Sequence, residues 1–167
     1  MSDFTFMEKK NAKLFVNSPN TLAGNYTEKL DTASAGFQQE AQVVDFAAEG
    51  EEEVLSGIRE LVSILPGNNN DTAFSDECMD DLNRMTENFA AEIADPAVAL
   101  EDIGDNNFFM EVKKEFAKEM VTGFICLDGM TIGVIANRTA QYDENGKTTA
   151  KYDARLTTAG CNKAVSF

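Results

Sequence analysis

The segment from Met120 to Asn137 constrains the fold more than any other part of the sequence. Its string MVTGFICLDGMTIGVIAN places two apolar, β-rich runs on either side of Asp128-Gly129, the dipeptide favoured in a two-residue type I′ turn. This pattern predicts an antiparallel β-hairpin. Because a lone two-stranded hairpin is only marginally stable in water, further strands must pair with it.

Weaker strand signals lie near both ends of the chain. Phe4–Met7 and Ala12–Val16 predict two short extended segments, bounded by the turn-forming string NSPN at 17–20. The string ENGK at 144–147 predicts a second hairpin. Residues 21–46 are rich in Ala, Ser, Thr and Gly and show poor periodicity, which predicts irregular chain with short elements.

A long amphipathic helix is predicted to begin at Glu51. Its first turn is acidic, which suits the helix dipole, and Pro66-Gly67 ends it. Apolar residues recur behind that turn at helical spacing: Val54, Ile58, Leu61, Val62 and Leu65. Of these, Val54, Ile58, Leu61 and Leu65 are expected to face inward. The polar string at 68–71 predicts a surface linker, and residues 76–89 form either a short acidic helix or an excursion.

Three further helical signals follow. Asp95 and Pro96 are typical of a helix N-cap and first position, and Gly104 marks the end of that helix. Its expected inner face is Val98, Leu100 and Ile103. The segment 108–118 predicts an amphipathic helix or turn over a sheet, with Phe109, Val112 and Phe116 on one side, and Thr157 or Thr158 predicts the cap of a last helix. The fold class expected is therefore α/β, or more strictly α+β.

Charge and hydropathy exclude several function classes. With 14 Lys+Arg against 29 Asp+Glu the net charge is -15, and the basic residues are interleaved with acids, so nucleic-acid binding is excluded. No apolar run approaches the roughly 18 residues that a membrane span needs, and no secretion signal is visible. A cytoplasmic protein without membrane insertion is expected, and its three dispersed cysteines predict reduced thiols.

The absence of histidine removes Ser-His and Cys-His nucleophile pairs and most transition-metal centres. Carboxylates, lysines, amides or the residues of a neighbour must carry any chemistry. The string DENG at 143–146 is interpreted as a turn, because the ligand spacing of a calcium loop is missing, and no phosphate-binding glycine loop is present. Gly160, Cys161 and Lys163 begin the last predicted helix, where backbone amides and a lysine can serve an anion.

Three strings together resemble the carboxyltransferase (beta-type) domain of biotin-dependent acyl-CoA carboxylases and decarboxylases, in the crotonase-like superfamily. They are DFTFMEKKNAKLFVNSPN at 3–20, FMEVKKEFAKEMVTGFICLDGMTIGVIAN at 109–137 and LTTAGCNKAVSF at 156–167. The resemblance implies a partial crotonase-like spiral. Residues 1–67 would end its first half, 68–94 would form a linker or excursion, and 95–167 would begin the second half.

The resemblance also implies a function: transfer of a carboxyl group between carboxybiotin and the α-carbon of an acyl-CoA, in either the carboxylation or the decarboxylation direction. It implies substrate-binding roles for Asn137, Gly160 and Lys163, and assigns no catalytic residue and no metal ligand. Its partners would be an acyl-CoA, a biotin carboxyl carrier protein or domain, the remaining part of the carboxyltransferase and further copies in a homo-oligomer.

The glycine-rich oxyanion strings of the family are expected to lie outside this chain, so the chain alone is expected to transfer no carboxyl group. Two alternatives stay open at this point. The chain could be a non-catalytic acidic interaction or scaffold module, or an inactive fragment of such an enzyme.

Overall fold

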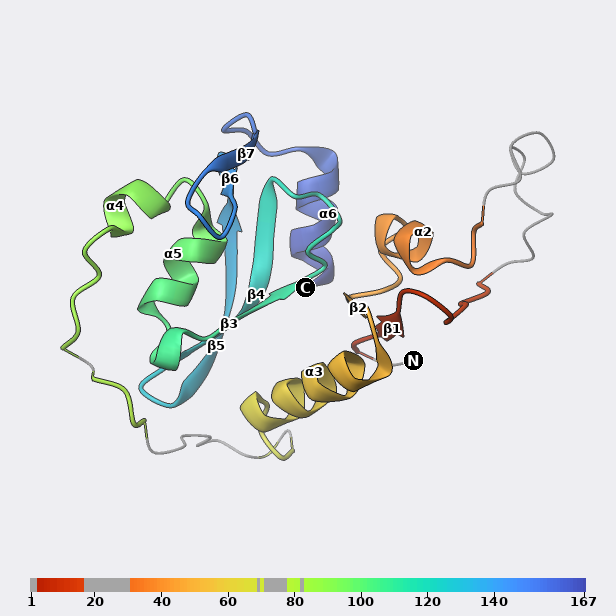
Figure 1. Cartoon of the computed structure of the whole chain (residues 1–167), viewed down its shortest axis with the longest axis horizontal. Helices are drawn as coiled ribbons and strands as arrows, with labels where there is room; N and C mark the ends of the chain where they lie inside the picture. Colours follow the sequence, from red (N-terminus) through yellow and green to blue (C-terminus); the bar gives the residue numbers. More distant parts are fainter. Residues whose placement is uncertain (1–2, 17–30, 69, 71–77, 82) are drawn as a thin grey trace. The chain divides into compact units, whose positions relative to one another are not determined.

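A computed structural model describes residues 3–16, 31–68, 70, 78–81 and 83–167. The chain divides into two compact units, Met1–Glu60 and Leu61–Phe167, which are described in turn (Figure 1). The predicted turn at 17–20 and parts of the segments 21–46 and 76–89 lie outside the described residues.

The first unit is built on a pair of short parallel strands. β1 (Phe6–Glu8) pairs with β2 (Phe46–Ala48), and the Phe6 and Phe46 rings stack with centroids 4.5 Å apart. The chain between them contains α2 (Ala35–Glu40). No strand forms at Ala12–Val16, so the second extended segment predicted there is wrong: Leu14 donates its N–H to the Ala33 carbonyl instead.

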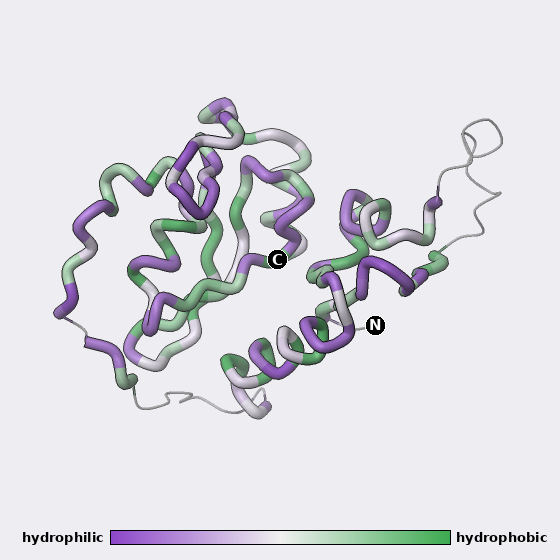
Figure 2. Tube along the Cα trace, viewed as in Figure 1, coloured by the Kyte–Doolittle hydropathy of each residue, from purple (hydrophilic) through white to green (hydrophobic). Residues whose placement is uncertain are grey.

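α3 (Glu51–Ile64) confirms the predicted long helix with its acidic first turn. Its predicted inner face is only partly right. Leu61 is buried and Val54 and Leu65 are half-buried, but Ile58 is 37% exposed. The apolar stripe of α3 is therefore wider than the side of the helix that is buried. The buried residues of the helix are Leu61 and Ile64. Figure 2 shows hydrophilic and hydrophobic residues alternating along this helix.

The second unit contains a three-stranded antiparallel sheet in the order β3-β4-β5. β4 (Met120–Leu127) and β5 (Met130–Asn137) pair along their whole length. Asp128 and Gly129 both have positive φ, 52° and 75°, as a type I′ turn requires. The predicted hairpin is confirmed. The Asp105 carboxylate accepts the N–H groups of both turn residues.

β3 (Phe109–Val112) corrects the prediction of a helix or turn over 108–118. Its residues alternate between half-buried and buried, the period of a strand, and they pair with β4 at the register Met110↔Phe124. The string FMEV begins with an aromatic residue and ends with a β-branched one, Phe109 and Val112, and both types suit a pleated surface. The rest of the segment forms turns.

The second predicted hairpin is also present. β6 (Ala140–Tyr142) pairs antiparallel with β7 (Thr148–Lys151), with a register shift at Gln141/Tyr142. The Asp143 carboxylate accepts the N–H groups of Asn145 and Lys147. This turn confirms the reading of the DENG string as a local loop.

Helices lie on both sides of the three-stranded sheet (Figure 1). α5 (Pro96–Ile103) has Asp95 as its N-cap and Gly104 as its C-cap, as predicted, and contacts β3 and β4. α6 (Thr158–Ser166) is capped by Thr157 and contacts β4. The short elements α4 (Phe89–Glu92) and η2 (Asp105–Asn107) flank α5.

The inner face predicted for α5 is half-buried, whereas Pro96 and Ala99 are its fully buried residues. Small residues allow this helix to approach the sheet closely. The buried hydrophobic residues of the sheet are Met110, Val112, Met120, Val121 and Ile125. Over the described ranges, no helix has the length and apolar character needed to cross a membrane.

Candidate functional site

The three predicted site residues lie at or near one end of the sheet in the second unit. Asn137 is the last residue of β5 and is paired in register with Met120, the first residue of β4. Cross-strand partners share one face of a sheet. Met120 in turn lies against Gly160 in the first turn of α6, because a Cβ built on Gly160 would be 3.4 Å from the Met120 Cβ.

Gly160 allows α6 to dock closely on the sheet. An added Cβ would lie 3.2 Å from Thr157 Oγ1 and 3.4 Å from Glu119 Oε1. The Gly160 N–H donates to Thr157 Oγ1 at 2.9 Å, and the Thr157 hydroxyl donates to Glu119 Oε1. The amide of Gly160 is therefore occupied by the helix cap, while that of Cys161 donates to the Thr157 carbonyl.

Lys163 is completely buried one turn further along α6. Its Nζ has no hydrogen-bond partner among the described residues. Burial lowers the pKa of this amine from 10.5 to about 8, against the opposing charges of Glu111 and Glu119, which raise it. A buried ammonium costs free energy unless it is paired, so Lys163 is a buried, incompletely satisfied cation.

Arg138, the residue after Asn137, ties the end of β5 to several segments. Its side chain is 2% exposed. Its Nε donates to Asp95 Oδ1 at 2.7 Å, its Nη2 to Glu111 Oε2 at 3.3 Å and its Nη1 to the Lys118 carbonyl at 3.2 Å. These are charge-assisted bonds in a water-poor setting, so Arg138 fixes where β5 ends relative to α5 and β3.

Asp95 is the acidic partner in this buried network. Beyond Arg138, its carboxylate accepts the N–H of Ala97 at 3.3 Å and that of Tyr142 at 2.9 Å. One side chain thus caps α5 and fixes the start of the second hairpin. Glu111 uses one oxygen for Arg138, while its Oε1 is buried with no hydrogen-bond partner in the described structure.

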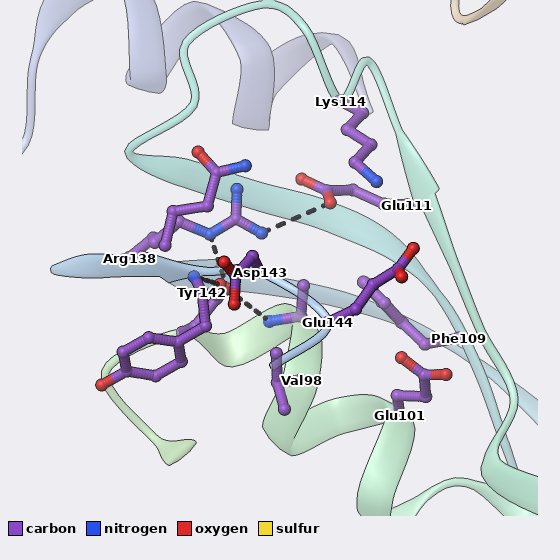
Figure 3. A pocket seen from close by; sticks show the side chains of 12 residues that line it. Val98, Glu101, Phe109, Glu111, Lys114, Arg138, Tyr142, Asp143 and Glu144 are labelled. Atoms are coloured by element: carbon purple, nitrogen blue, oxygen red, sulfur yellow. Dashed lines mark hydrogen bonds and ion pairs between the residues drawn. The ribbon is translucent and has the colours of Figure 1, made fainter. Parts of the chain in front are cut away.

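A pocket of about 370 Å³ opens beside this network. Figure 3 shows the side chains that line it, with Arg138 bonded to Glu111 at one end. Val98 and Phe109 supply apolar surface. Polar and charged side chains make up most of the rest: Asp95, Glu101, Glu111, Lys114, Arg138, Gln141, Tyr142, Asp143 and Glu144. Acids outnumber bases there, so the pocket favours cationic over anionic groups.

Cysteine and metal chemistry have little support in the described ranges. Cys161 is exposed on α6, Cys78 and Cys126 are half-buried, and none of the three forms a disulfide. No group of three or more Asp, Glu or Cys side chains has a geometry that could hold a metal ion there.

The family model for the carboxyl transferase domain matches residues 1–164. The chain belongs to the carboxyl transferase domain family. The propionyl-CoA carboxylase beta chain of Roseobacter denitrificans is 32% identical over 149 residues, which is 83% of this chain and 29% of that protein. The methylmalonyl-CoA decarboxylase alpha subunit of Veillonella parvula is 28% identical over the same shares of each chain.

A solved structure gives the same assignment for the fold. The hexameric transcarboxylase 12S, solved with methylmalonyl-coenzyme A and methylmalonic acid bound, matches 82% of this chain with a TM-score of 0.67 and 25% identity. The match confirms the expected crotonase-like carboxyltransferase fold. This chain covers 28% of that chain, so it spans less than a third of the carboxyltransferases that it matches.

Sequence reasoning missed the buried charge network of this carboxyltransferase domain. Asp95 was identified only as a helix cap, and Arg138 and Glu111 were assigned no role. One signal for a buried charge was available, because Arg138 directly follows the apolar, uncharged segment that forms β5. Its partner, 43 residues away in sequence, could not be found from local spacing.

Proposed function

We propose that this chain forms part of a carboxyltransferase that moves a carboxyl group between carboxybiotin and the α-carbon of an acyl-CoA. The observation that carries the proposal is the match to transcarboxylase 12S, whose solved structure holds methylmalonyl-coenzyme A. Propionyl-CoA carboxylase and methylmalonyl-CoA decarboxylase relatives support an acyl-CoA as the substrate class, in a soluble, cytoplasmic, oligomeric enzyme.

In this proposal residues 1–67 complete one crotonase-like half, residues 68–94 connect the halves, and residues 95–167 begin the second half. The remaining part of the enzyme supplies the other residues of the site. A biotin carrier protein or domain delivers the cofactor, which supplies an activated carboxyl group when bound.

Asn137, Gly160 and Lys163 are proposed to border the substrate. Asn137 is exposed, and its amide offers the donor and the acceptor that a ureido group can use. Gly160 permits the close approach of α6 to β4. Lys163 places a buried positive charge beneath that helix turn, where it favours negative charge developing on a bound carbonyl oxygen.

The test replaces the matched segment of the Roseobacter denitrificans beta chain with this chain. Carboxyl transfer from methylmalonyl-CoA to free biotin is then measured, with circular dichroism and sedimentation to establish that the chimera folds and assembles. Measurable transfer supports the proposal. A folded, assembled chimera without transfer contradicts it.

The same chimera tests the site residues. Asn137→Ala is expected to lower kcat/KM by about tenfold, as the loss of one positioned hydrogen bond does. Asn145→Ala, in the exposed turn between β6 and β7, is the matched control and should leave kcat/KM unchanged. Equal kcat/KM for the two variants would remove Asn137 from the proposed site.

A further inference from the structure

Two cavities of the second unit share part of their walls. The first is the pocket of about 370 Å³ beside Arg138. The second, of about 640 Å³, is bordered by Asn88, Ala91 and Glu92 at α4. Both are lined by the same five residues of α5 and the β6–β7 hairpin: Val98, Glu101, Tyr142, Asp143 and Glu144. The two cavities therefore adjoin.

Negative charge dominates both linings. Five carboxylates and two cations line the first cavity, and one of these cations, Arg138, already pairs with Asp95 and Glu111. Four carboxylates line the second cavity, and among the described residues no lysine or arginine lines it. Walls of one sign concentrate counter-ions of the other sign, so both cavities attract cations.

Each cavity also has a buried carboxylate oxygen that lacks a hydrogen-bond donor. The side chain of Glu111 is 7% exposed, and Figure 3 shows it beside the first cavity with one oxygen bonded to Arg138. Its other oxygen, Oε1, is buried with no partner among the described residues, and so is Glu92 Oε2 at the second cavity. A buried acceptor left unpaired is unfavourable, so a donor that reached either oxygen would be stabilised there.

The nearby lysines leave Glu111 Oε1 without a donor. Burial lowers the pKa of Lys163, and the charge of Glu111 opposes this shift, yet the Lys163 Nζ makes no hydrogen bond within the described structure. Lys163 also lines neither cavity. Lys114 lines the first cavity and is exposed, so its ammonium is solvated at the mouth. A donor for Glu111 Oε1 must therefore come from a ligand.

We propose that the two cavities together bind an aliphatic α,ω-diamine, with one ammonium at Glu111 and the other at Glu92. An alkyl ammonium has three donors and, like that of lysine, is charged at neutral pH. Val98 lines both cavities and offers apolar surface to the methylene chain, and Tyr142 offers an aromatic ring to a cation. In the described ranges no cluster of three acidic or cysteine side chains suits a metal ion, which favours an organic cation. This inference goes beyond carboxyl transfer and is tested by binding alone.

The test is isothermal titration calorimetry of this chain with the series from 1,3-diaminopropane to 1,6-diaminohexane, in about 0.15 M NaCl to screen diffuse attraction. One chain length should bind best, because the two carboxylates lie at a fixed separation. The monoamine of the same length, which reaches only one carboxylate, should bind at least about tenfold more weakly. The diol of that length carries no charge and should give no binding.

Glu111→Gln keeps an oxygen for Arg138 but removes the charge, and Glu92→Gln does the same at the second cavity. Each should weaken binding of the best diamine by about tenfold or more. Glu52→Gln, on the exposed first turn of α3 in the first unit, is the matched control and should leave the affinity unchanged. Lys114→Met removes an opposing charge from the mouth and should strengthen binding several-fold.

Circular dichroism establishes that the variants fold, and Glu92→Gln and Lys114→Met decide the outcome if Glu111→Gln does not. The proposal is overturned if no diamine gives saturable binding, or if the monoamine binds as tightly as the diamine. Equal losses of affinity in Glu92→Gln and Glu52→Gln would also overturn it, because they would show general attraction to an acidic protein. Diamine binding by a chimera without carboxyl transfer would contradict the proposed function and keep the diamine site.

Discussion

Lys163 illustrates how one side chain can make stability depend on pH. Its folded pKa is about 8, against an ordinary value of 10.5. Below about pH 8 the amine is protonated in both folded and unfolded chains, so its cost is constant. Between about pH 8 and 10.5 the unfolded chain binds more protons, and the free energy of unfolding contributed by Lys163 rises with pH.

Replacing Lys163 with Met should therefore stabilise the protein at pH 7 by about 1–3 kcal/mol, because Met fills similar space without a charge. The gain should shrink as the pH rises from about 8 to 10.5. Urea unfolding of both proteins at several pH values measures this difference, in which other titrating groups cancel. A gain that is constant across that range would contradict a lowered pKa for Lys163.

Arg138 is a residue whose loss should be costly. Arg138→Met would leave the buried carboxylates of Asp95 and Glu111 without their cation, at a cost of about 3–5 kcal/mol. Arg155→Met is the control, because Arg155 pairs with Asp153 on the surface, with side chains 76% and 75% exposed. Thermal unfolding should separate the two variants clearly, and similar melting temperatures would argue against a structural role for the buried network.

At the scale of helices and strands, the sequence predicted the turns and caps that depend on adjacent residues. The type I′ turn at Asp128-Gly129 and the caps of α5 and α6 each depend on a few adjacent residues. β3 was mistaken for helix or turn because Phe109, Val112 and Phe116 also fit a helical spacing. Only its pairing with β4, a tertiary contact, decides between the two.

α3 offers a direct test of which side of a helix is packed. Leu61 is 5% exposed and its neighbour Val62 is 67% exposed, although both fit the apolar stripe. Leu61→Asp buries an unpaired charge and should cost several kcal/mol, on the order of 3, whereas Val62→Asp should change stability by at most about 0.5 kcal/mol. Urea unfolding of both variants measures this, and equal losses would show that Val62 is packed as well.

Two strand glycines should differ sharply in their tolerance of a methyl group. A Cβ on Gly123 of β4 would lie 2.3 Å from the Met110 carbonyl oxygen, which is backbone and cannot turn aside. On Gly133 of β5 it would meet the Phe167 ring at 3.3 Å, a side chain that can shift. Gly123→Ala should cost about 3 kcal/mol or more and Gly133→Ala about 1 kcal/mol or less, as measured by thermal unfolding; the reverse order would contradict the described sheet.

Over the whole molecule, an excess of negative charge opposes compaction. With a net charge of -15, self-repulsion destabilises the folded state, and salt screens it over about 10 Å at 0.1 M. Raising NaCl from about 0.02 to 0.5 M should therefore increase the melting temperature, since the buried Arg138 pairs are screened much less. A fall in melting temperature would mean that surface ion pairs outweigh the repulsion.

The candidate site was predictable only in part at this scale. Asn137, Gly160 and Lys163 were chosen by resemblance, and their gathering at one end of the sheet depends on the docking of α6 against β4. The burial of Lys163 could not be foreseen, because a lysine in the last turn of a short helix is ordinarily solvated. The parallel pairing of β1 with β2, 40 residues apart at Phe6↔Phe46, was equally hidden from local patterns.

The bond between Arg138 and Asp95 also implies an order of events during folding. β4 and β5 are joined by two residues, so their pairing closes a short loop and can form within about 1–10 μs. The Arg138 guanidinium can pair only with a residue 43 positions away in sequence, and this pairing requires α5 and β3 to be in place. Closing a longer loop also costs more entropy. We therefore expect the hairpin to form early in folding and the buried ion pair to form last. Loss of the ion pair would then mainly accelerate unfolding.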